Sequence, residues 1–260
     1  MMGTFTAVVR RIDGFCDEVP RQWATVEDDG PLRLFVREGP GWPFYARPVP
    51  GGGPVTGADV VRVRARQREL RLPEAFEWLP AAAPSMLDAV RDAGMAPRLC
   101  PLLVLEGEPL PSPLPPGYDA RLLGPADGDL AAAADALHAV AAEAFGLGAQ
   151  RGLSATELAA LRTDLADGRV ARLLVTGPDG PVAAGSAQRS GDVVEIVGIG
   201  TLPPARRRGL AGAVTAVLAG AARAAGADVV FLAAADEPAS RVYQRVGFQV
   251  VGHTGIAEAP

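Results

Sequence analysis

The sequence predicts a mixed α/β fold in which a mostly antiparallel sheet is flanked by helices. Strand-like runs occur in pairs joined by turn residues, as at Gly177–Gly180. Each set of pairs precedes a strand, a loop, a helix and a further strand, an order that produces a mixed sheet. A weaker version of this order recurs in the first half, which predicts two related tandem subdomains.

Composition limits the classes of function. The chain has 260 residues, enough for one large or two modest domains, and its 48% hydrophobic and 21% charged residues are typical of a soluble globular protein. A net charge of −5 argues against general nucleic-acid binding. Neither a leader pattern nor an apolar run of membrane-spanning length is present, so we expect no membrane partner and a cytoplasmic location. Cys16 and Cys100 lie far apart and predict reduced thiols, with no metal site.

A proline-rich stretch divides the chain. Five prolines lie within residues 109–116, and so many prolines cannot continue a helix or a central strand. We therefore expect a first subdomain over 1–108, a linker over 109–116 and a catalytic domain over 117–260.

In the second half, hydrophobic spacing and turn residues give the expected elements. Ser154 and Glu157 form a capping-box pattern that predicts the beginning of a helix. Apolar residues at helical spacing predict the other helices, and short apolar runs predict the strands. The expected helices are 127–145, one from Ser154, 209–225 and 238–246, and the expected strands are 118–123, 170–176, 181–189, 193–201, 229–233 and 248–251.

The first half gives a similar but weaker series. A hairpin is expected from residues 32–36 and 44–48 across Gly39-Pro40-Gly41, followed by a helix over 58–70. A strand over 74–79, a helix over 84–95 that ends in a Gly cap, and a strand over 99–105 complete it. This tail resembles the helix and strand that close the second half.

The segment from Glu195 to Gly212 carries the chemistry. A strand ends at Pro203-Pro204, and an arginine-rich loop leads into a helix at Gly209. Free N–H groups and the dipole at a helix N-terminus favour an anion, and the small residues Gly209 and Ala211 let a diphosphate approach the backbone. The spacing is neither that of the P-loop nor that of the dinucleotide motif.

Arg206, Gly209 and Ala211 resemble the R/Q-x-x-G-x-G/A signature of the GNAT N-acetyltransferase superfamily. The strand in front, the helix behind and the later Tyr243-x-x-x-Gly247-Phe248 segment match in order and spacing, over about residues 117–255. The first half lacks this signature, since its Pro50–Pro54 loop contains no arginine. If that half is GNAT-like, we expect it to have lost cofactor binding.

The resemblance implies acetyl-CoA as cosubstrate and assigns roles by position. The pantetheine arm would lie along Ile199, Gly200 and Thr201, and the pyrophosphate along Arg206, Arg207, Arg208, Gly209, Leu210, Ala211 and Gly212. Asp236 stands where many members have an Asn near the cofactor. Tyr243 stands where many members have the Tyr that protonates the departing thiolate, and Glu195 stands where histone-type members have a general base.

The implied function is an N-acetyltransferase that moves an acetyl group to a primary amine through a ternary complex, without a metal. Two alternatives stay open for the residues, since Glu195 also fits a polar position on a solvated strand face and Tyr243 a core aromatic. The alternative function is a non-catalytic acyl-CoA-binding or sensory module. The acceptor, a small-molecule or peptide amine, is expected along residues 127–166, the first half and the loop of the final strand. Both acetyl and longer acyl groups, and both a monomer and a homodimer, fit the sequence.

Overall fold

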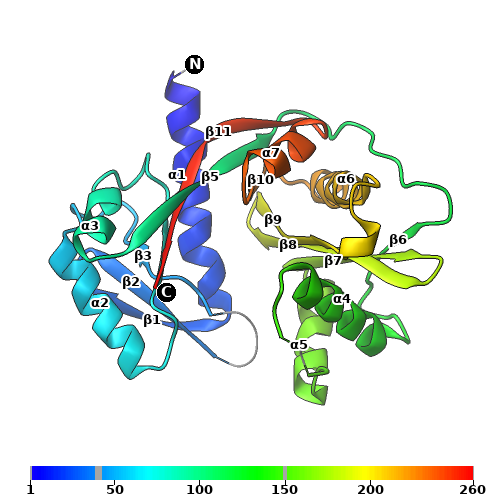
Figure 1. The fold of residues 1–260 in the computed structure, drawn as a ribbon, viewed down its shortest axis with the longest axis horizontal. Coiled ribbons are helices and arrows are strands. Elements are labelled where there is room, and N and C mark those ends of the chain that lie inside the picture. The colour runs from blue at the N-terminus through cyan, green and yellow to red at the C-terminus, as the bar shows by residue number, and fades with distance from the viewer. Residues whose placement is uncertain (1, 39–42, 149–150, 260) are drawn as a thin grey trace. The chain divides into compact units, whose positions relative to one another are not determined.

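The computed structural model describes residues 2–38, 43–148 and 151–259 (Figure 1). The helices are α1 (Met2–Glu18), α2 (Gly57–Glu69), α3 (Met86–Asp92), α4 (Leu130–Ala144), α5 (Ala155–Ala166), α6 (Leu210–Ala224) and α7 (Glu237–Gln244), with short 3-10 turns η1 (Val19–Gln22) and η2 (Pro203–Ala205). The strands are β1 (Ala24–Asp29), β2 (Leu32–Arg37), β3 (Arg47–Pro48), β4 (Ala75–Trp78), β5 (Ala96–Leu105), β6 (Asp119–Leu122), β7 (Val170–Gly177), β8 (Gly180–Ser190), β9 (Val193–Thr201), β10 (Val229–Ala233) and β11 (Phe248–Glu258).

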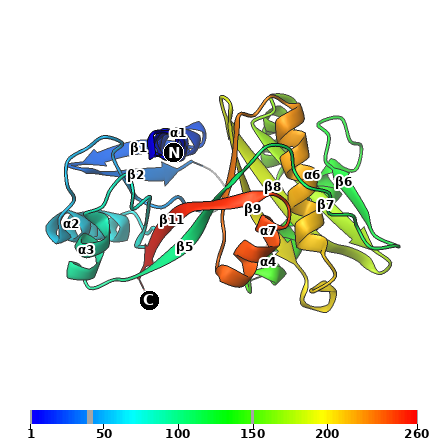
Figure 2. The same cartoon turned by 90° about the horizontal axis from the view of Figure 1, so that it is seen from above.

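The chain forms two compact units, and neither is a single continuous segment. The first unit contains residues 1–102, 233–236 and 251–260, and the second contains 103–232 and 237–250. β5 and β11 therefore each contribute residues to both units, and Figure 2 shows the two strands side by side. The sequence predicts a contiguous division at the linker over residues 109–116, and that division stays a prediction. The two compact units are not contiguous, because the end of β11 groups with the first half.

The order of elements repeats between the two halves. Three strands, a helix, a strand, a helix and a strand run from β1 to β5 and again from β7 to β11. The loop between β3 and α2 thus corresponds to the loop between β9 and α6. The predicted fold class is confirmed: a mixed, mostly antiparallel sheet flanked by helices, with two tandem subdomains of related element order.

In the second unit, helices cover both faces of the sheet. β6, β7, β8 and β9 are antiparallel neighbours, and β10 pairs with β9 in parallel. A Cβ on Gly185 of β8 would lie 2.5 Å from Val214 of α6, whereas a Cβ on Gly200 of β9 would lie 2.9 Å from Ala144 of α4. α6 and α4 therefore pack on opposite faces, as Figure 1 shows.

The first unit has its own core. Its members come from β2, α2, β4, α3, the end of β11 and the segments next to these elements, namely Leu32, Leu34, Ala46, Val55, Val60, Val63, Phe76, Trp78, Met86, Ala89, Val90, Ala93, Met95 and Ala257. β11 pairs with β4 in antiparallel register from Gly255↔Trp78 to Glu258↔Ala75. The end of β11 thus pairs with a strand of the first unit, whose strands β1, β2 and β3 form a separate sheet.

Two elements of the first unit were missed by sequence reasoning. α1 buries Val9, Ile12 and Phe15 at helical spacing, a signal that Gly14 interrupts. β1 ends in acidic residues, which strands usually disfavour. Here each carboxylate is paired with an arginine: Glu27 with Arg66, Asp28 with Arg33, and Asp29 with Arg62.

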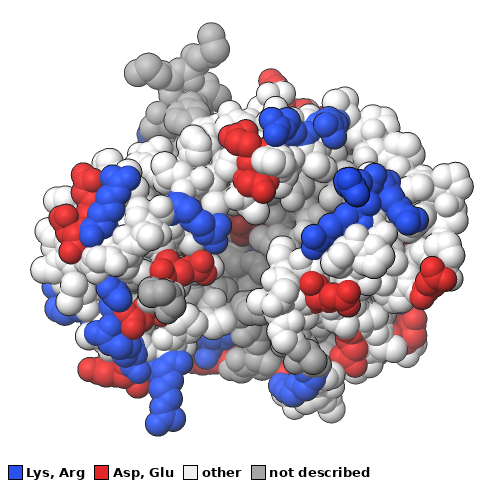
Figure 3. Space-filling model, in the orientation of Figure 1, with Lys and Arg blue, Asp and Glu red and all other residues white. Residues whose placement is uncertain are grey.

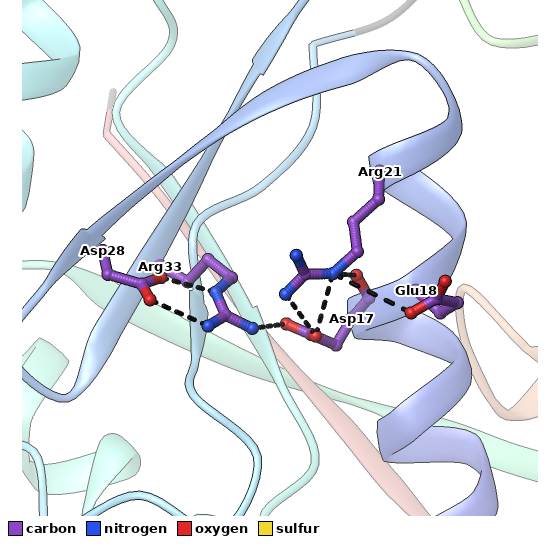
Figure 4. A network of polar contacts seen from close by, with 5 residues as sticks. All are labelled: Asp17, Glu18, Arg21, Asp28 and Arg33. Carbon is purple, nitrogen blue, oxygen red and sulfur yellow. Dashed lines mark hydrogen bonds and ion pairs between the residues drawn. The ribbon is translucent and has the colours of Figure 1, made fainter.

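One of these arginines, Arg33, connects α1 to the hairpin of β1 and β2. Arg33 bonds Asp28 at 2.6 Å and Asp17 of α1 at 2.6 Å, and Asp17 also accepts a bond of 2.8 Å from Arg21 (Figure 4). Because Arg33 and Asp17 are largely buried, this network fixes α1 against the hairpin. The Arg33 guanidinium also holds the pKa of Asp28 below its usual value.

The other expected elements of the first half agree with the structure in part. β2 and β3 pair in antiparallel register, as the hairpin required, but β3 is shorter than the expected strand over 44–48. The predicted turn at Gly39-Pro40-Gly41 lies outside the described residues. No helix in the part of the chain that the structure describes is both long enough and apolar enough to cross a membrane.

The Gly255→Ala substitution tests how tightly the end of β11 packs in the first unit. A Cβ on Gly255 would lie 2.3 Å from Cε2 of Trp78, whose side chain is fully buried. We expect a loss of about 1–3 kcal/mol in the free energy of unfolding, measured by urea denaturation, because the ring cannot move aside without strain. Gly53→Ala in the same unit meets no atom within 4 Å and should change stability by less than about 0.5 kcal/mol. Equal stability of the two variants would contradict the packing.

Candidate functional site

β9 is paired on both sides over only part of its length. Its parallel register with β10 runs from Val193↔Val229 to Glu195↔Phe231, and β9 then continues to Thr201. Residues 196–201 of β9 therefore lie beyond the segment of the strand that pairs with β10. An unpaired strand edge presents N–H and C=O groups that an extended ligand can bind.

A β-bulge lies within this stretch. Ala184 of β8 faces Gly200, whereas Ser186 faces Val197, so β9 has one extra residue between these pairs. Gly198 has a φ of +63° and is exposed, a conformation that glycine adopts without the penalty of a side chain. The bulge changes the direction of β9 just before the arginine-rich loop.

The N-terminus of α6 is open to an anion. The first bond within the helix runs from the N–H of Ala213 to the C=O of Gly209, so the N–H groups of Leu210, Ala211 and Gly212 precede the helical ladder. Gly209 is the N-cap, with a φ of +82° and no side-chain cap. A Cβ on Gly209 would meet no described atom within 4 Å, so the position beside the cap is not crowded.

The matching helix of the first unit begins differently. The side chain of Thr56, the N-cap of α2, accepts a bond from the N–H of Asp59, and the Asp59 carboxylate accepts one from the N–H of Thr56. α2 thus satisfies its own N-terminus with a negative charge of its own. This supports the expectation that the first half has lost the anion site.

The predicted arginines have different roles in the structure. Arg206 donates from Nε to the C=O of Thr201 (3.1 Å) and from a terminal nitrogen to the C=O of Ala144 (3.0 Å). It joins the end of β9 to the C-terminus of α4, where a cation is favoured by the helix dipole. Arg208 donates to the hydroxyl of Tyr118 (2.7 Å) and to the C=O of Pro204 (3.4 Å).

Arg207 completes the group. It has a φ of +63°, and its side chain is exposed. Such a backbone costs about 1 kcal/mol or more in a residue other than glycine, which makes the loop one of the strained segments of the second unit. In Figure 3 positive side chains gather over the beginning of α6.

The residues that we expect along acetyl-CoA face different elements of the second unit, and some of them can offer only their backbone to a ligand. Ile199 faces α6, since its Cγ1 would lie 3.6 Å from a Cβ on Gly185. Gly200 faces α4, Leu210 is buried, and a Cβ on Gly212 would lie 2.8 Å from Oγ of Ser112 in the proline-rich linker. Leu210 and Gly212 can therefore contribute backbone groups only.

α7, the helix that contains Tyr243, approaches the beginning of α6 through Val242. Cγ1 of Val242 would lie 3.9 Å from a Cβ on Gly212, and Tyr243 is half-buried. Asp236 is exposed and groups with the first unit, and its expected place near the cofactor stays a prediction.

Glu195 lies on the face of the sheet that α4 covers. It is opposite Gln188 in the register with β8. Alternate residues of a strand share a face, so Gln188 and Ser186 share the face of Ala184, which packs on α4. The same register places Glu195 beside them, half-buried. A carboxylate and an amide on this face can accept hydrogen bonds from an ammonium or amine group.

Sequence reasoning missed three residues of this region. Tyr118 contacts Arg208, Gln188 faces Glu195, and Gly198 forms the bulge. The glycine between β-branched residues was a detectable bulge signal, whereas the other two depend on contacts between segments far apart in the sequence.

The Arg206→Ala substitution tests whether the two hydrogen bonds of Arg206 stabilise the fold, in comparison with the exposed Arg207 of the same loop. Loss of the two bonds to carbonyl groups should lower the free energy of unfolding by roughly 1–2 kcal/mol, measured by chemical denaturation. Arg207→Ala is the matched control, because the described residues give its side chain no hydrogen bond, and we expect a change below about 0.5 kcal/mol. If both variants lose the same stability, Arg206 does not brace β9 against α4.

Comparisons with known proteins agree with this geometry. Residues 174–255 match the family model of the FR47-like proteins, a span that contains β8, β9, the arginine-rich loop, α6 and α7. The curated proteins give no match to this sequence.

Solved structures share the fold over nearly the whole chain. A GCN5-related N-acetyltransferase from Kribbella flavida is 22% identical with a TM-score of 0.72, and the match covers 97% of this chain and 96% of that one. A GCN5-related N-acetyltransferase-like protein from Streptococcus suis is 13% identical with a TM-score of 0.59, over 97% and 99%.

A tandem protein is also similar. A tandem GNAT protein from the clavulanic acid biosynthesis pathway is 17% identical with a TM-score of 0.50, and the match covers 88% of this chain and 79% of that one. The second half of the chain thus contains a segment similar to the FR47-like proteins, and the whole chain shares the fold of GCN5-related N-acetyltransferase structures.

Proposed function

We propose that this protein transfers an acetyl group from acetyl-CoA to a primary amine. The observation that carries the proposal is the uncapped N-terminus of α6 at the end of a strand that extends past its register with β10. A diphosphate and an extended amide-containing arm are the two parts of CoA that such a pair of features fits.

The residues present fit the diphosphate. The N–H groups of Leu210, Ala211 and Gly212 precede the helical ladder, and a Cβ on Gly209 would meet no described atom within 4 Å. Arg207 and Arg208 add cationic donors that strengthen such bonds. A cation at a helix N-terminus is unfavourable without an anion, so an anionic ligand explains the charge of the loop.

The edge of β9 suits the pantetheine arm and the thioester. Backbone groups from Val197 to Thr201 extend past the register with β10, and the amides of the arm can bond to them as an added strand. When the amine attacks the thioester, negative charge develops on the carbonyl oxygen. A backbone N–H near Ile199 would stabilise this charge.

The amine must lose a proton to react. A lysine-like amine has a pKa of about 10.4, so its neutral form lies roughly 4–5 kcal/mol uphill at pH 7. Glu195, beside Gln188 on the face covered by α4, would accept the proton directly or through water. The amine nitrogen then forms its bond to the carbonyl carbon as the carbon–sulfur bond breaks.

The departing thiolate takes a proton to complete the reaction. Tyr243 of α7 would donate this proton, and solvent would restore it. A thiolate is a tolerable leaving group by itself, because thiols are more acidic than phenols. General acid catalysis therefore contributes only part of the rate.

Thiol release from acetyl-CoA over a panel of small-molecule and peptide amines tests the proposed function. We expect amine-dependent release together with a micromolar or tighter dissociation constant for CoA in calorimetry. Binding of acetyl-CoA without release for any amine would favour the alternative, a non-catalytic acyl-CoA-binding or sensory module. Tighter binding of ATP than of CoA would contradict both.

Tyr243→Phe should lower the turnover number with saturating acetyl-CoA by about 10–10³-fold, because the thiolate must then leave without its acid. The dissociation constant for acetyl-CoA should change little, since the ring is kept. Unchanged turnover would remove Tyr243 from the mechanism and leave it as a packing residue.

Glu195→Gln should lower kcat/KM at pH 7 by about 10²–10⁴-fold and leave less of a deficit at pH 9, where more of the amine is already neutral. Gln188→Leu is a control on the same face, and it should alter the KM for the amine without this change in the pH profile. A Glu195→Gln deficit that is equal at both pH values would argue against a base.

A further inference from the structure

We propose that Tyr118 is a positioning residue, which sets the affinity for the diphosphate of the donor by holding Arg208 in place. The inference rests on the proposed function and adds to it a residue outside the matched motif. Tyr118 precedes β6 at the end of the proline-rich linker, far in sequence from the loop that it contacts.

The ring of Tyr118 is fixed by a glycine. A Cβ on Gly177, the last residue of β7, would lie 2.9 Å from Cε1 and 3.2 Å from Cδ1 of Tyr118. The ring thus lies directly on the backbone of Gly177, which any side chain there would prevent. The N–H of Tyr118 also bonds to the C=O of Pro115 at 3.2 Å, so both ends of the residue are held.

The hydroxyl of Tyr118 reaches the anion loop from this fixed ring. It accepts a bond of 2.7 Å from a terminal nitrogen of Arg208, and the other terminal nitrogen donates to the C=O of Pro204 at 3.4 Å. A guanidinium has five N–H donors, so these two bonds orient the group and leave donors for a ligand.

The contrast with Arg206 and Arg207 gives Arg208 its role. Arg206 bonds two carbonyl groups that join β9 to α4, and Arg207 is exposed on a strained backbone. Arg208 is the arginine of the three whose guanidinium is held by a side chain from another segment. Ordering a long side chain before binding lowers the entropy lost when the ligand binds.

Tyr118→Phe tests the inference, because phenylalanine keeps the ring on Gly177 and removes only the acceptor for Arg208. We expect the KM and the dissociation constant for acetyl-CoA to rise about 3–10-fold, with kcat at saturation within about twofold of the unaltered protein. For S-acetylpantetheine, which lacks the nucleotide diphosphate, Tyr118→Phe should change neither constant.

Two further variants make the outcome specific. Tyr45→Phe removes a hydroxyl bond of 2.8 Å to Glu258 in the first unit. It should leave the KM and the dissociation constant unchanged for both acetyl-CoA and S-acetylpantetheine. In an Arg208→Ala background, Tyr118→Phe should add no further loss, since the hydroxyl would then have nothing to hold.

An unchanged dissociation constant for acetyl-CoA in Tyr118→Phe, or an equal loss with S-acetylpantetheine, would overturn the positioning role. Failure of the proposed function looks different, because the unaltered protein would then release no thiol from acetyl-CoA with any amine, whether or not it binds CoA.

Discussion

The backbone amides at the beginning of α6 are the groups on which the rest of the site depends. They precede the first bond of the helical ladder, and the N-cap is a glycine in a left-handed conformation that offers no side chain in their place. Free helical N–H groups and the helix dipole together favour an anion. The proposed roles of the arginine-rich loop, of the bulged strand β9 and of α7 all depend on these N–H groups.

The first unit contains a matching helix, α2, whose N-terminus is capped by side chains of the helix itself. α2 follows the same element order as α6, yet the Thr56 and Asp59 side chains bond its N-terminus reciprocally. A carboxylate in this position competes with any phosphate for the same dipole. The first unit still packs a full core around Trp78 and Phe76, and it takes its last strand from the end of the chain. One order of elements therefore gives a helix N-terminus capped by its own side chains in one half and one without a side-chain cap in the other.

The positive charges in the loop of the second unit are divided between contacts within the protein and the proposed anion site. Arg206 occupies carbonyl groups at the end of β9 and at the C-terminus of α4, which fixes the two elements that flank the open strand edge. Arg208 is directed by Tyr118, whose ring depends on the missing side chain of Gly177. Three neighbouring arginines that look equivalent in the sequence are thus held by different partners, and their substitution should have different effects on stability and on affinity.

The sequence by itself determined the local features of this protein. Turn residues, helical spacing and the capping box at Ser154 predicted β7 to β10 and α4 to α7 closely, and the arginine–glycine spacing predicted the open beginning of α6, because these signals act over a few residues. The strand β1, which ends in acidic residues, was not predicted from the sequence, since the arginines that pair with its carboxylates come from α2 and β2. Only the tertiary structure decided that the end of β11 groups with the first unit, that Glu195 faces Gln188, and that Tyr118 contacts Arg208. Each of these depends on strand register or on the packing of distant segments, which local pattern does not encode.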